Sequence, residues 1–329
     1  MPSQIAPIDL ATIQRPIHQH LDDVFDELRR IIVSDFPFIT QVNAHLMRMK
    51  GKFFRPTLVL LAARATDDVD RADLTLAAVV ELIHLATLVH DDSVDHSVLR
   101  RGEPTINAIF SHQVAVIMGD YLYSRAIIEL VELGDPVPLR VMSRVTNEMT
   151  VGEMRELKSY DSLDYSEDDY YELIRCKTAS LMSAACDIGA RRTRPDVREA
   201  MRQYGLRLGM AFQVADDVLD YTEPESVTGK PSGLDLREHR VTLPLIAAVP
   251  RMSRDERVVV ERLMADPSPG DDLVAEVIES VRMHGGVESA RQRALELAAE
   301  AEAELDLLTD SPARDSLRDC LTYVVERRS

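Results

Sequence analysis

The apolar residues of this chain recur every three or four positions almost continuously from about residue 13 onward. This period is typical of amphipathic helices, and no stretch shows the alternating, β-branched pattern that is typical of strands. Glycines and prolines separate the helical stretches. The pattern predicts an all-α protein, a single large helical bundle in one domain over residues 1–329. We expect helices at roughly 13–33, 38–50, 56–67, 71–96, 105–112, 113–133, 136–158, 166–191, 195–221, 241–249, 253–266, 272–284, 286–307 and 311–327.

Two segments do not follow the helical period. Residues 1–12 are predicted to form a loose N-terminal arm. Residues 222–240 contain two prolines and two glycines, which favours a loop. This loop carries Lys230, Arg237 and Arg240, and we interpret it as a mobile lid over a cavity; an ordinary solvent-exposed loop is the alternative.

Composition narrows the class of protein. Hydrophobic residues make up 45% of the chain and tryptophan is absent, so the core must be largely aliphatic. The formal net charge of -18 repels phosphates, which disfavours nucleic acid and anionic lipid as main partners. The cysteines show no paired spacing, which indicates reduced thiols and a cytoplasmic protein. With neither a signal-peptide pattern nor a run of about 18 apolar residues, we expect at most transient contact with a membrane.

The segment from Leu74 to Val89 is apolar on almost every side, which is typical of a helix at the centre of a bundle. It is followed by a DDxxD motif, and helix 195–221 ends in a second one. The two motifs comprise Asp91, Asp92 and Asp95, and Asp216, Asp217 and Asp220. Crowded carboxylates at the end of a buried helix repel one another, and magnesium ions that bridge to phosphates would neutralise them. A single motif could be a solvated acidic helix end; two copies, each after an apolar helix, favour metal–diphosphate chemistry.

An anionic substrate with its metal ions needs cations around it, and the sequence offers two basic groups near the predicted helix ends. Lys52 and Arg55 stand at the predicted start of a helix, where free N–H groups favour anions; a basic surface turn is the alternative. Arg100 and Arg101 follow the first motif on a predicted loop, from which they could reach back over it.

Further polar residues lie within the predicted helices. Lys177 and Thr178 stand among small apolar residues, which favours an interior position over a surface one. Gln213 lies one turn before the second motif, on the face of Asp216. His84 precedes the first motif on the same helix, where a lone histidine is more often a core residue than a ligand contact.

With these residues collected, the chain resembles the trans-isoprenyl diphosphate synthases, also called polyprenyl synthetases. The segments that carry the resemblance are GKFFRP, ELIHLATLVHDDSVDHSVLRRGEPT, GDYLYSRA, CKTASL, GMAFQVADDVLDYT and TGKPSGLDLREHRVTLPL, which span about residues 51–246. One departure is Arg240, where many members have lysine. The resemblance implies an enzyme of the isoprenoid synthase fold that adds isopentenyl diphosphate to an allylic diphosphate, such as farnesyl or geranylgeranyl diphosphate, and forms a homodimer.

The resemblance also implies roles for the collected residues. Asp91, Asp95 and Asp216 would hold three magnesium ions on the allylic diphosphate, and Asp92, Asp217 and Asp220 would complete or support these shells. Arg100, Lys177, Lys230 and Arg240 would bind the allylic diphosphate. Lys52, Arg55, His84 and Arg101 would bind isopentenyl diphosphate. Thr178 and Gln213 would line the reacting carbons.

The small residues Ala86 and Thr87 lie about one turn before Asp91, where family members that stop at fifteen carbons tend to carry aromatic residues. A helix over 71–96 is roughly 39 Å long, so a channel beside it could hold many isoprene units. We therefore predict a product of about thirty-five to fifty carbons, suited to a quinone side chain. The alternatives are a short-chain farnesyl or geranylgeranyl diphosphate synthase, a class I terpene cyclase and a non-catalytic partner subunit.

Overall fold

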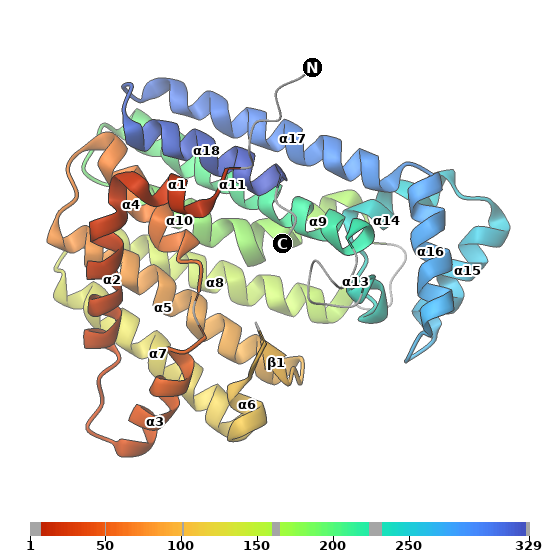
Figure 1. Ribbon diagram of the computed structural model, residues 1–329, viewed down its shortest axis with the longest axis horizontal. Helices are drawn as coiled ribbons and strands as arrows, with labels where there is room; N and C mark the ends of the chain where they lie inside the picture. The colour runs from red at the N-terminus through yellow and green to blue at the C-terminus, as the bar shows by residue number, and fades with distance from the viewer. Residues whose placement is uncertain (1–7, 50, 101, 160–164, 224–231, 327–329) are drawn as a thin grey trace.

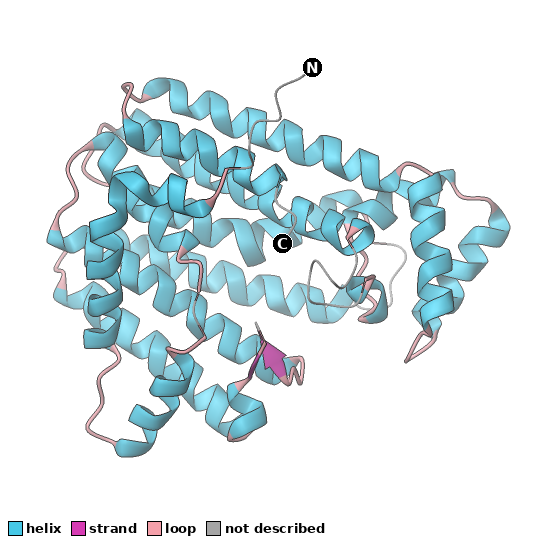
Figure 2. Cartoon of the chain, viewed as in Figure 1, coloured by secondary structure: helices cyan, strands magenta, loops and turns pink. Residues whose placement is uncertain are grey.

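The computed structural model of the protein describes residues 8–49, 51–100, 102–159, 165–223 and 232–326. Nearly all of these residues are helical, which confirms the predicted all-α class (Figures 1 and 2). The first half of the chain comprises α1 (Leu10–Gln14), a 3-10 turn (Arg15–Ile17), α2 (His18–Ile31), α3 (Pro37–Leu46), α4 (Phe54–Thr66), α5 (Arg71–Val94), β1 (Leu99–Arg100), β2 (Glu103–Pro104), α6 (Ile106–Ile109), α7 (His112–Glu132) and α8 (Pro136–Ser159).

The second half begins with one long helix that contains a π-helical turn. Its parts are α9 (Glu167–Ile174), the π-helix (Arg175–Ala179) and α10 (Ser180–Gly189). The remaining elements are α11 (Pro195–Thr222), α13 (Leu234–Arg237), α14 (Leu243–Ala248), a 3-10 turn (Val249–Arg251), α15 (Arg254–Ala265), α16 (Asp271–Met283), α17 (Gly286–Glu304), a 3-10 turn (Leu305–Leu307) and α18 (Pro312–Glu326).

Helix α5 lies inside the bundle, packed against α2, α4, α7 and α10. A capping box between Asp70 and Asp73 fixes its first turn. Arg191 and Arg192, from the turn before α11, form ion pairs with the fully buried Asp73. Helix α5 is long and apolar enough to cross a membrane, but 67% of its most apolar 18-residue window is buried inside the protein. Its composition is therefore that of a core helix, as the all-round apolar pattern predicts.

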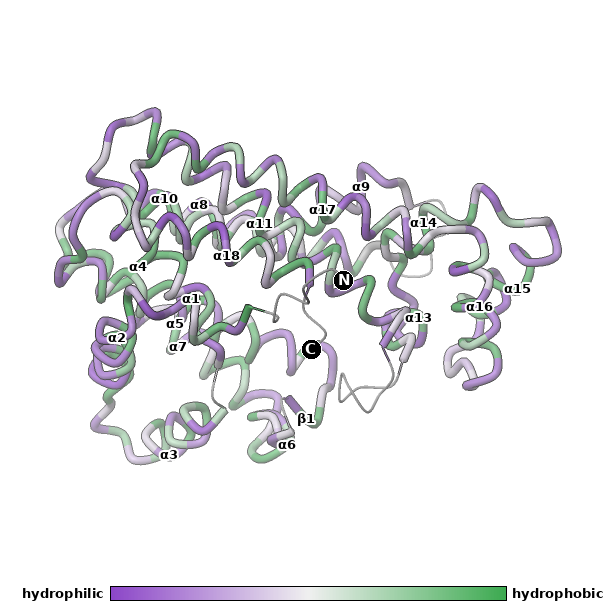
Figure 3. Tube along the Cα trace, turned by 45° about the horizontal axis from the view of Figure 1, so that its top comes forward, coloured by the Kyte–Doolittle hydropathy of each residue, from purple (hydrophilic) through white to green (hydrophobic). Residues whose placement is uncertain are grey.

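The buried apolar side chains form a large cluster among the long helices and a smaller one under α13 to α16. The outer helices alternate between hydrophilic and hydrophobic positions, as expected for helices that cover a core on one face (Figure 3). The smaller cluster includes Tyr221, at the end of α11, and Leu236 of α13. The segment after the second acidic motif is thus attached to a core of its own.

Three details differ from the predictions. Helix α1 begins at Leu10, capped by the Asp9 side chain, so residues 8–12 are not a loose arm. Residues 99–104 form a two-residue antiparallel hairpin, too short to produce a strand pattern in the sequence. In the predicted lid, α11 runs on to Thr222 and residues 234–237 form α13, whose Leu236 is fully buried. The C-terminal part of the predicted lid is therefore anchored, and residues 224–231 lie outside the described residues.

Candidate active site

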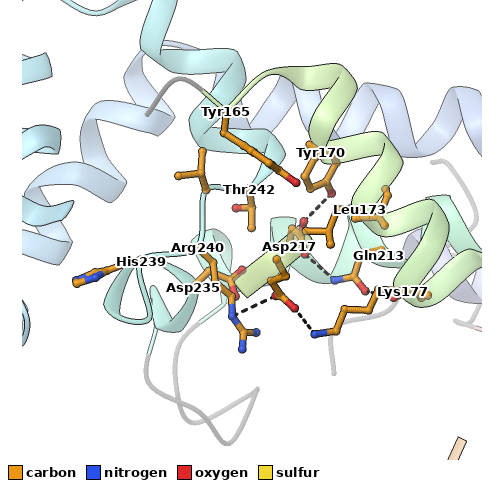
Figure 4. A pocket seen from close by; sticks show the side chains of 14 residues that line it. Tyr165, Tyr170, Leu173, Lys177, Gln213, Asp217, Asp235, His239, Arg240 and Thr242 are labelled. Carbon is orange, nitrogen blue, oxygen red and sulfur yellow. Dashed lines mark hydrogen bonds and ion pairs between the residues drawn. The ribbon is translucent and has the colours of Figure 1, made fainter. Parts of the chain in front are cut away.

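A pocket of about 180 Å³ lies between the π-helix, α11 and the chain that follows α13. Figure 4 shows polar side chains from these separate elements directed toward one space. The polar residues that line the pocket include Glu156, Lys177, Thr178, Gln213, Asp217, Asp235 and Arg240. Five of these seven were predicted as site residues from the sequence, and the fold brings them together from distant parts of the chain.

The π-helix positions Lys177 and Thr178. In a regular α-helix, adjacent residues point about 100° apart, whereas here both line the same pocket. Glycines on both flanking helices let the neighbouring backbones approach this turn. A Cβ at Gly209 of α11 would lie 2.5 Å from Ala179 Cα, and one at Gly152 of α8 would lie 2.9 Å from Cys176 Cβ. Single π-turns are frequent at functional sites, and this one is fixed by close backbone packing.

Hydrogen bonds connect the predicted reacting-carbon residues to the second acidic motif. The Thr178 hydroxyl donates to Gln213 Oε1 at 2.9 Å, and Gln213 Nε2 donates to Asp217 Oδ1 at 2.8 Å. The Tyr170 hydroxyl donates to Asp217 Oδ2 at 2.6 Å. Burial raises the pKa of Asp217, and the two hydrogen bonds oppose that rise only in part. Asp217 therefore supports Gln213 from within the protein.

Asp220 fastens the second motif to α13. Its two carboxylate oxygens accept hydrogen bonds from the backbone N–H groups of Leu234 at 2.9 Å and Asp235 at 3.0 Å. A carboxylate suits the free N–H groups at the start of a helix. The Asp235 carboxyl lines the pocket, and burial together with Asp217 and Asp220 raises its pKa. Asp216, in contrast, is exposed.

The first motif faces the same region as the second. Arg240 NH2 lies 3.5 Å from Asp95 Oδ2, so a residue of the pocket wall reaches the end of α5. Burial raises the pKa of Asp91 to about 6; Asp95 adds to the rise, while Lys177 and Arg100 oppose it. Asp92 is buried and bound by Arg100, whose Nε is 2.8 Å from Asp92 Oδ1. Asp92 thus holds the hairpin that carries Arg100.

Lys177 forms ion pairs with two glutamates of α8. Its Nζ is 3.0 Å from Glu153 Oε1 and also pairs with Glu156. Burial alone would lower the pKa of Lys177, but the two glutamates outweigh it, so that the pKa is raised. Burial raises the pKa of Glu153 to about 7. The region around Asp91 and Lys177 is therefore rich in desolvated carboxylates.

The predicted isopentenyl diphosphate residues also converge in part. Arg55 NH1 lies 2.9 Å from His84 Nε2, which joins the start of α4 to α5. Gln14 of α1 donates from Nε2 to the carbonyl oxygen of Lys52 at 3.2 Å and to the hydroxyl of Thr57 at 2.9 Å. The N-terminal helix therefore supports the turn that presents Lys52.

Other predicted residues are placed less directly. Arg101 and Lys230 lie outside the described residues. Arg237, a cation of the predicted lid, forms an ion pair with Asp271 of α16 at 2.8 Å. Ala86 is buried, and the Thr87 hydroxyl donates to the carbonyl oxygen of His84 at 2.8 Å.

The acidic residues fit magnesium in donor chemistry. Carboxylate oxygens from α5 and α11 are hard ligands, and the raised pKa of Asp91 and Glu153 marks negative charge that a divalent cation would relieve. Among the described residues, no three His, Cys, Asp or Glu side chains form a ready-made ion site.

Sequence reasoning missed Glu153, Glu156, Tyr170 and Asp235. Glu153 and Glu156 stand three residues apart on α8 and so share a face, but a chain with 56 acidic residues has many such pairs. Asp235 lies in the predicted lid, where a single aspartate produces no distinctive pattern. Only the spatial position of these residues beside Lys177 and Arg240 distinguishes them.

Comparison with known proteins gives one consistent result. The polyprenyl synthetase family model matches residues 36–281. The octaprenyl diphosphate synthase of Escherichia coli is 37% identical over 296 residues, which cover 89% of this chain and 91% of that protein. The solved structure of a decaprenyl diphosphate synthase from Rhodobacter capsulatus is similar with a TM-score of 0.93 and 34% identity, covering 98% of this chain and 100% of that one.

A polyprenyl synthase from Caulobacter crescentus, solved with calcium and isoprenyl diphosphate, has a TM-score of 0.93 and 32% identity, with 98% of this chain and 99% of that one covered. The heptaprenyl diphosphate synthase component 2 of Geobacillus stearothermophilus is 36% identical over 307 residues, which cover 92% of this chain and 94% of that protein.

The raised pKa of Asp91 predicts a pH-dependent gain in stability when its charge is removed. An unfolded aspartate titrates near pH 4, so between about pH 4 and 6 the folded chain favours the protonated Asp91. The stability that protonated Asp91 contributes is fully present below about pH 4 and is lost as the pH rises through about 6. Asp91→Asn should raise the free energy of unfolding by about 1–2 kcal/mol above that range, because the partly solvated carboxylate carries less than the full penalty.

The measurement is urea denaturation with a chelator present, from about pH 4 to about pH 8. Wild type and Asp91→Asn should have equal stability at the acidic end and diverge toward the basic end. A stability difference that does not change with pH would contradict the raised pKa.

Proposed function

The chain belongs to the polyprenyl synthetase family, and we propose that its pocket joins isopentenyl diphosphate to an allylic diphosphate through the residues collected above. It is a prenyltransferase that builds an all-trans polyprenyl diphosphate by head-to-tail condensation. The observation that carries the site assignment is the convergence of Lys177, Thr178, Gln213, Asp217 and Arg240 on one pocket beside both acidic motifs.

In the proposed arrangement, Lys177 and Arg240 bind the allylic diphosphate, as do Arg100 and Lys230. Asp91, Asp95 and Asp216 would hold three magnesium ions. When bound, these ions would offset the negative charge of the diphosphate as it leaves. The remaining aspartates act through their partners: Asp92 holds Arg100, Asp217 holds Gln213 and Asp220 holds α13. Cations aimed at a leaving group are most effective in a desolvated pocket, which the burial of this region provides.

The isopentenyl diphosphate would bind at Lys52, Arg55, His84 and Arg101. The allylic C–O bond breaks, which leaves an allylic cation and pyrophosphate, and the isopentenyl double bond then forms the new C–C bond. The proton lost from the adduct goes to the pyrophosphate. The oxygens of Thr178 and Gln213 face the pocket and would stabilise the cation, while their hydrogen bond fixes their orientation.

The product is proposed to have about thirty-five to fifty carbons, because small residues line α5 before the first motif. The named relatives include octaprenyl and decaprenyl synthases, which supports this range. We also propose that the enzyme is cytoplasmic and contacts membranes only transiently. Within the polyprenyl class, the exact product length would depend on how far the space beside Ala86 and Thr87 extends.

The central test is an incubation of the purified protein with farnesyl diphosphate, isopentenyl diphosphate and magnesium. We expect linear all-trans products of about thirty-five to fifty carbons, resolved by chromatography after dephosphorylation, and loss of turnover on addition of EDTA. A dominant product of fifteen or twenty carbons would contradict the chain-length proposal. A cyclised hydrocarbon, or turnover that EDTA leaves intact, would contradict the reaction itself.

A second prediction concerns Ala86, which is 3% exposed. Ala86→Phe should shorten the product, because an aromatic ring five residues before Asp91 would close the space into which the chain is proposed to grow. Thr87→Ser, on the same turn, adds no volume and should leave product length unchanged. Thermal melting of both variants checks that the fold is retained. Unchanged product length in a folded Ala86→Phe variant would show that the chain grows elsewhere.

We propose that the protein forms a homodimer through α7 and α8. These helices pack against each other, and their shared outer face exposes large apolar side chains, of which Ile117 is 63% exposed and Met154 65%. The other exposed apolar residues on this face include Val116, Tyr123, Val131, Val151 and Leu157. A two-fold axis would let the same face cover itself, as most soluble homo-oligomers do. The connection between α7 and α8 is short, so the two helices run antiparallel. The Tyr123 hydroxyl lies 3.2 Å from Thr146 Oγ1, and this register places Ile117 of α7 near the level of Met154 of α8.

Light scattering coupled to gel filtration tests this proposal. The wild type should have the mass of two chains, and the double variant Ile117→Glu with Met154→Glu should have the mass of one, because it places unpaired charge in the apolar interface. Val258→Glu, at an exposed apolar residue of α15, is the matched control and should leave the mass unchanged. A monomeric wild type, or a double variant that stays dimeric, would contradict the interface.

A further inference from the structure

Two of the cations proposed to bind the allylic diphosphate, Lys177 and Arg240, share a carboxylate of the protein. Lys177 comes from the π-helix and Arg240 from the chain after α13, and both point into the pocket (Figure 4). Glu156 of α8 forms an ion pair with Lys177 Nζ, and its Oε1 lies 3.7 Å from Arg240 Nε. Glu156 therefore stands at the point where a diphosphate would also have to engage these two side chains.

The packing of α8 against the π-helix builds this arrangement. Gly152 permits the close approach, since a Cβ there would lie 3.3 Å from the backbone nitrogen of Lys177. Glu153 follows directly and binds Lys177 at 3.0 Å, and Glu156 lies one turn further on the same face. Glu156 is only 8% exposed, so water screens its charge weakly. The glutamates are thus a fixed part of the pocket wall.

The charges around Lys177 and Arg240 explain the role of Glu153 and Glu156. Without Glu153 and Glu156, Lys177 would be a cation in a half-buried pocket that attracts any phosphate anion, while Arg240 would still pair with Asp95 at 3.5 Å and Glu238 at 3.2 Å. With them, the cations are already compensated and remain directed into the pocket. A bare anion must then compete with Glu156, while an anion accompanied by divalent cations brings positive charge that the nearby carboxylates, including Asp91, attract.

We propose that Glu156, assisted by Glu153, is an internal counter-anion that makes the site selective for metal-complexed diphosphates over free ones. It is a positioning residue that acts through Lys177 and Arg240. The inference rests on the proposed function of this pocket and adds a selection rule to it. The same competition would weaken the hold on pyrophosphate once the metal ions leave, which would favour release of that product.

Calorimetric titration of the full-length protein with inorganic pyrophosphate tests this, with either magnesium or EDTA present. Glu156→Gln keeps the shape of the side chain and removes its charge. We expect it to bind pyrophosphate at least about tenfold more tightly in EDTA, with a smaller change in magnesium, so that the metal dependence of binding decreases. Glu153→Gln should shift binding in the same direction by less, and it serves as the second variant should Glu156→Gln fold poorly.

Glu148→Gln is the matched control. This residue lies on the same helix and pairs with Arg175 at 3.3 Å, outside the pocket, so it removes the same charge without touching Lys177. Pyrophosphate binding by the Gln variants of Glu156 and Glu153 that is unchanged or weaker in EDTA would overturn the inference, as would an equal gain in Glu148→Gln. Failure of the wild type to bind pyrophosphate even with magnesium would instead overturn the proposed function and the inference with it.

Discussion

The site depends on an unfavourable placement of charge. Both acidic motifs lie in the last turns of long helices, where the helix dipole already presents partial negative charge, and α5 adds desolvation in the middle of the bundle. The folded chain offsets this repulsion only in part. Several of the aspartates are engaged by protein donors: Asp92 by Arg100, Asp217 by Tyr170 and Gln213, Asp220 by the backbone of α13, and Asp95 by Arg240 at 3.5 Å. The remaining repulsion is what gives the site its attraction for divalent cations.

The scaffold tolerates this charge because it is tightly constrained elsewhere. The interior of the bundle is aliphatic and closely packed. Glycines at helix contacts let the backbones approach so closely that neighbouring segments have little room to shift. Buried ion pairs such as Asp73 with Arg191 fix the far end of α5, at the opposite end from the aspartates. A residue that repels its neighbours can be held in place only if the surrounding backbone cannot move away.

The sequence predicted the parts of the protein that follow from periodicity and composition. Helices α5 and α11, the acidic motifs at their ends and the lysine of the π-helix all leave a local signal. The folding of α13 does not, because it depends on the distant Asp220 carboxylate, and the hairpin at residues 99–104 and the five-residue α1 are too short to produce a periodic pattern. Glu156 illustrates the same limit. Its neighbours in sequence are ordinary for an acidic helix, and its role appears only when Lys177 and Arg240 are placed beside it. The roles of Arg101 and Lys230 remain predictions from the resemblance.

The π-helical turn has a consequence for how this family of folds can change. A π-turn holds one residue more than an α-turn, so a one-residue deletion within 175–179 could restore an unbroken α-helix at little cost to helical hydrogen bonding. The flanking helices would keep their faces toward the bundle, because the π-turn alone absorbs the extra residue, whereas the side chains within the turn would be redirected and Lys177 would leave the pocket. Length changes in this short stretch therefore offer a route by which a descendant could lose chemistry and retain its architecture with both aspartate motifs intact.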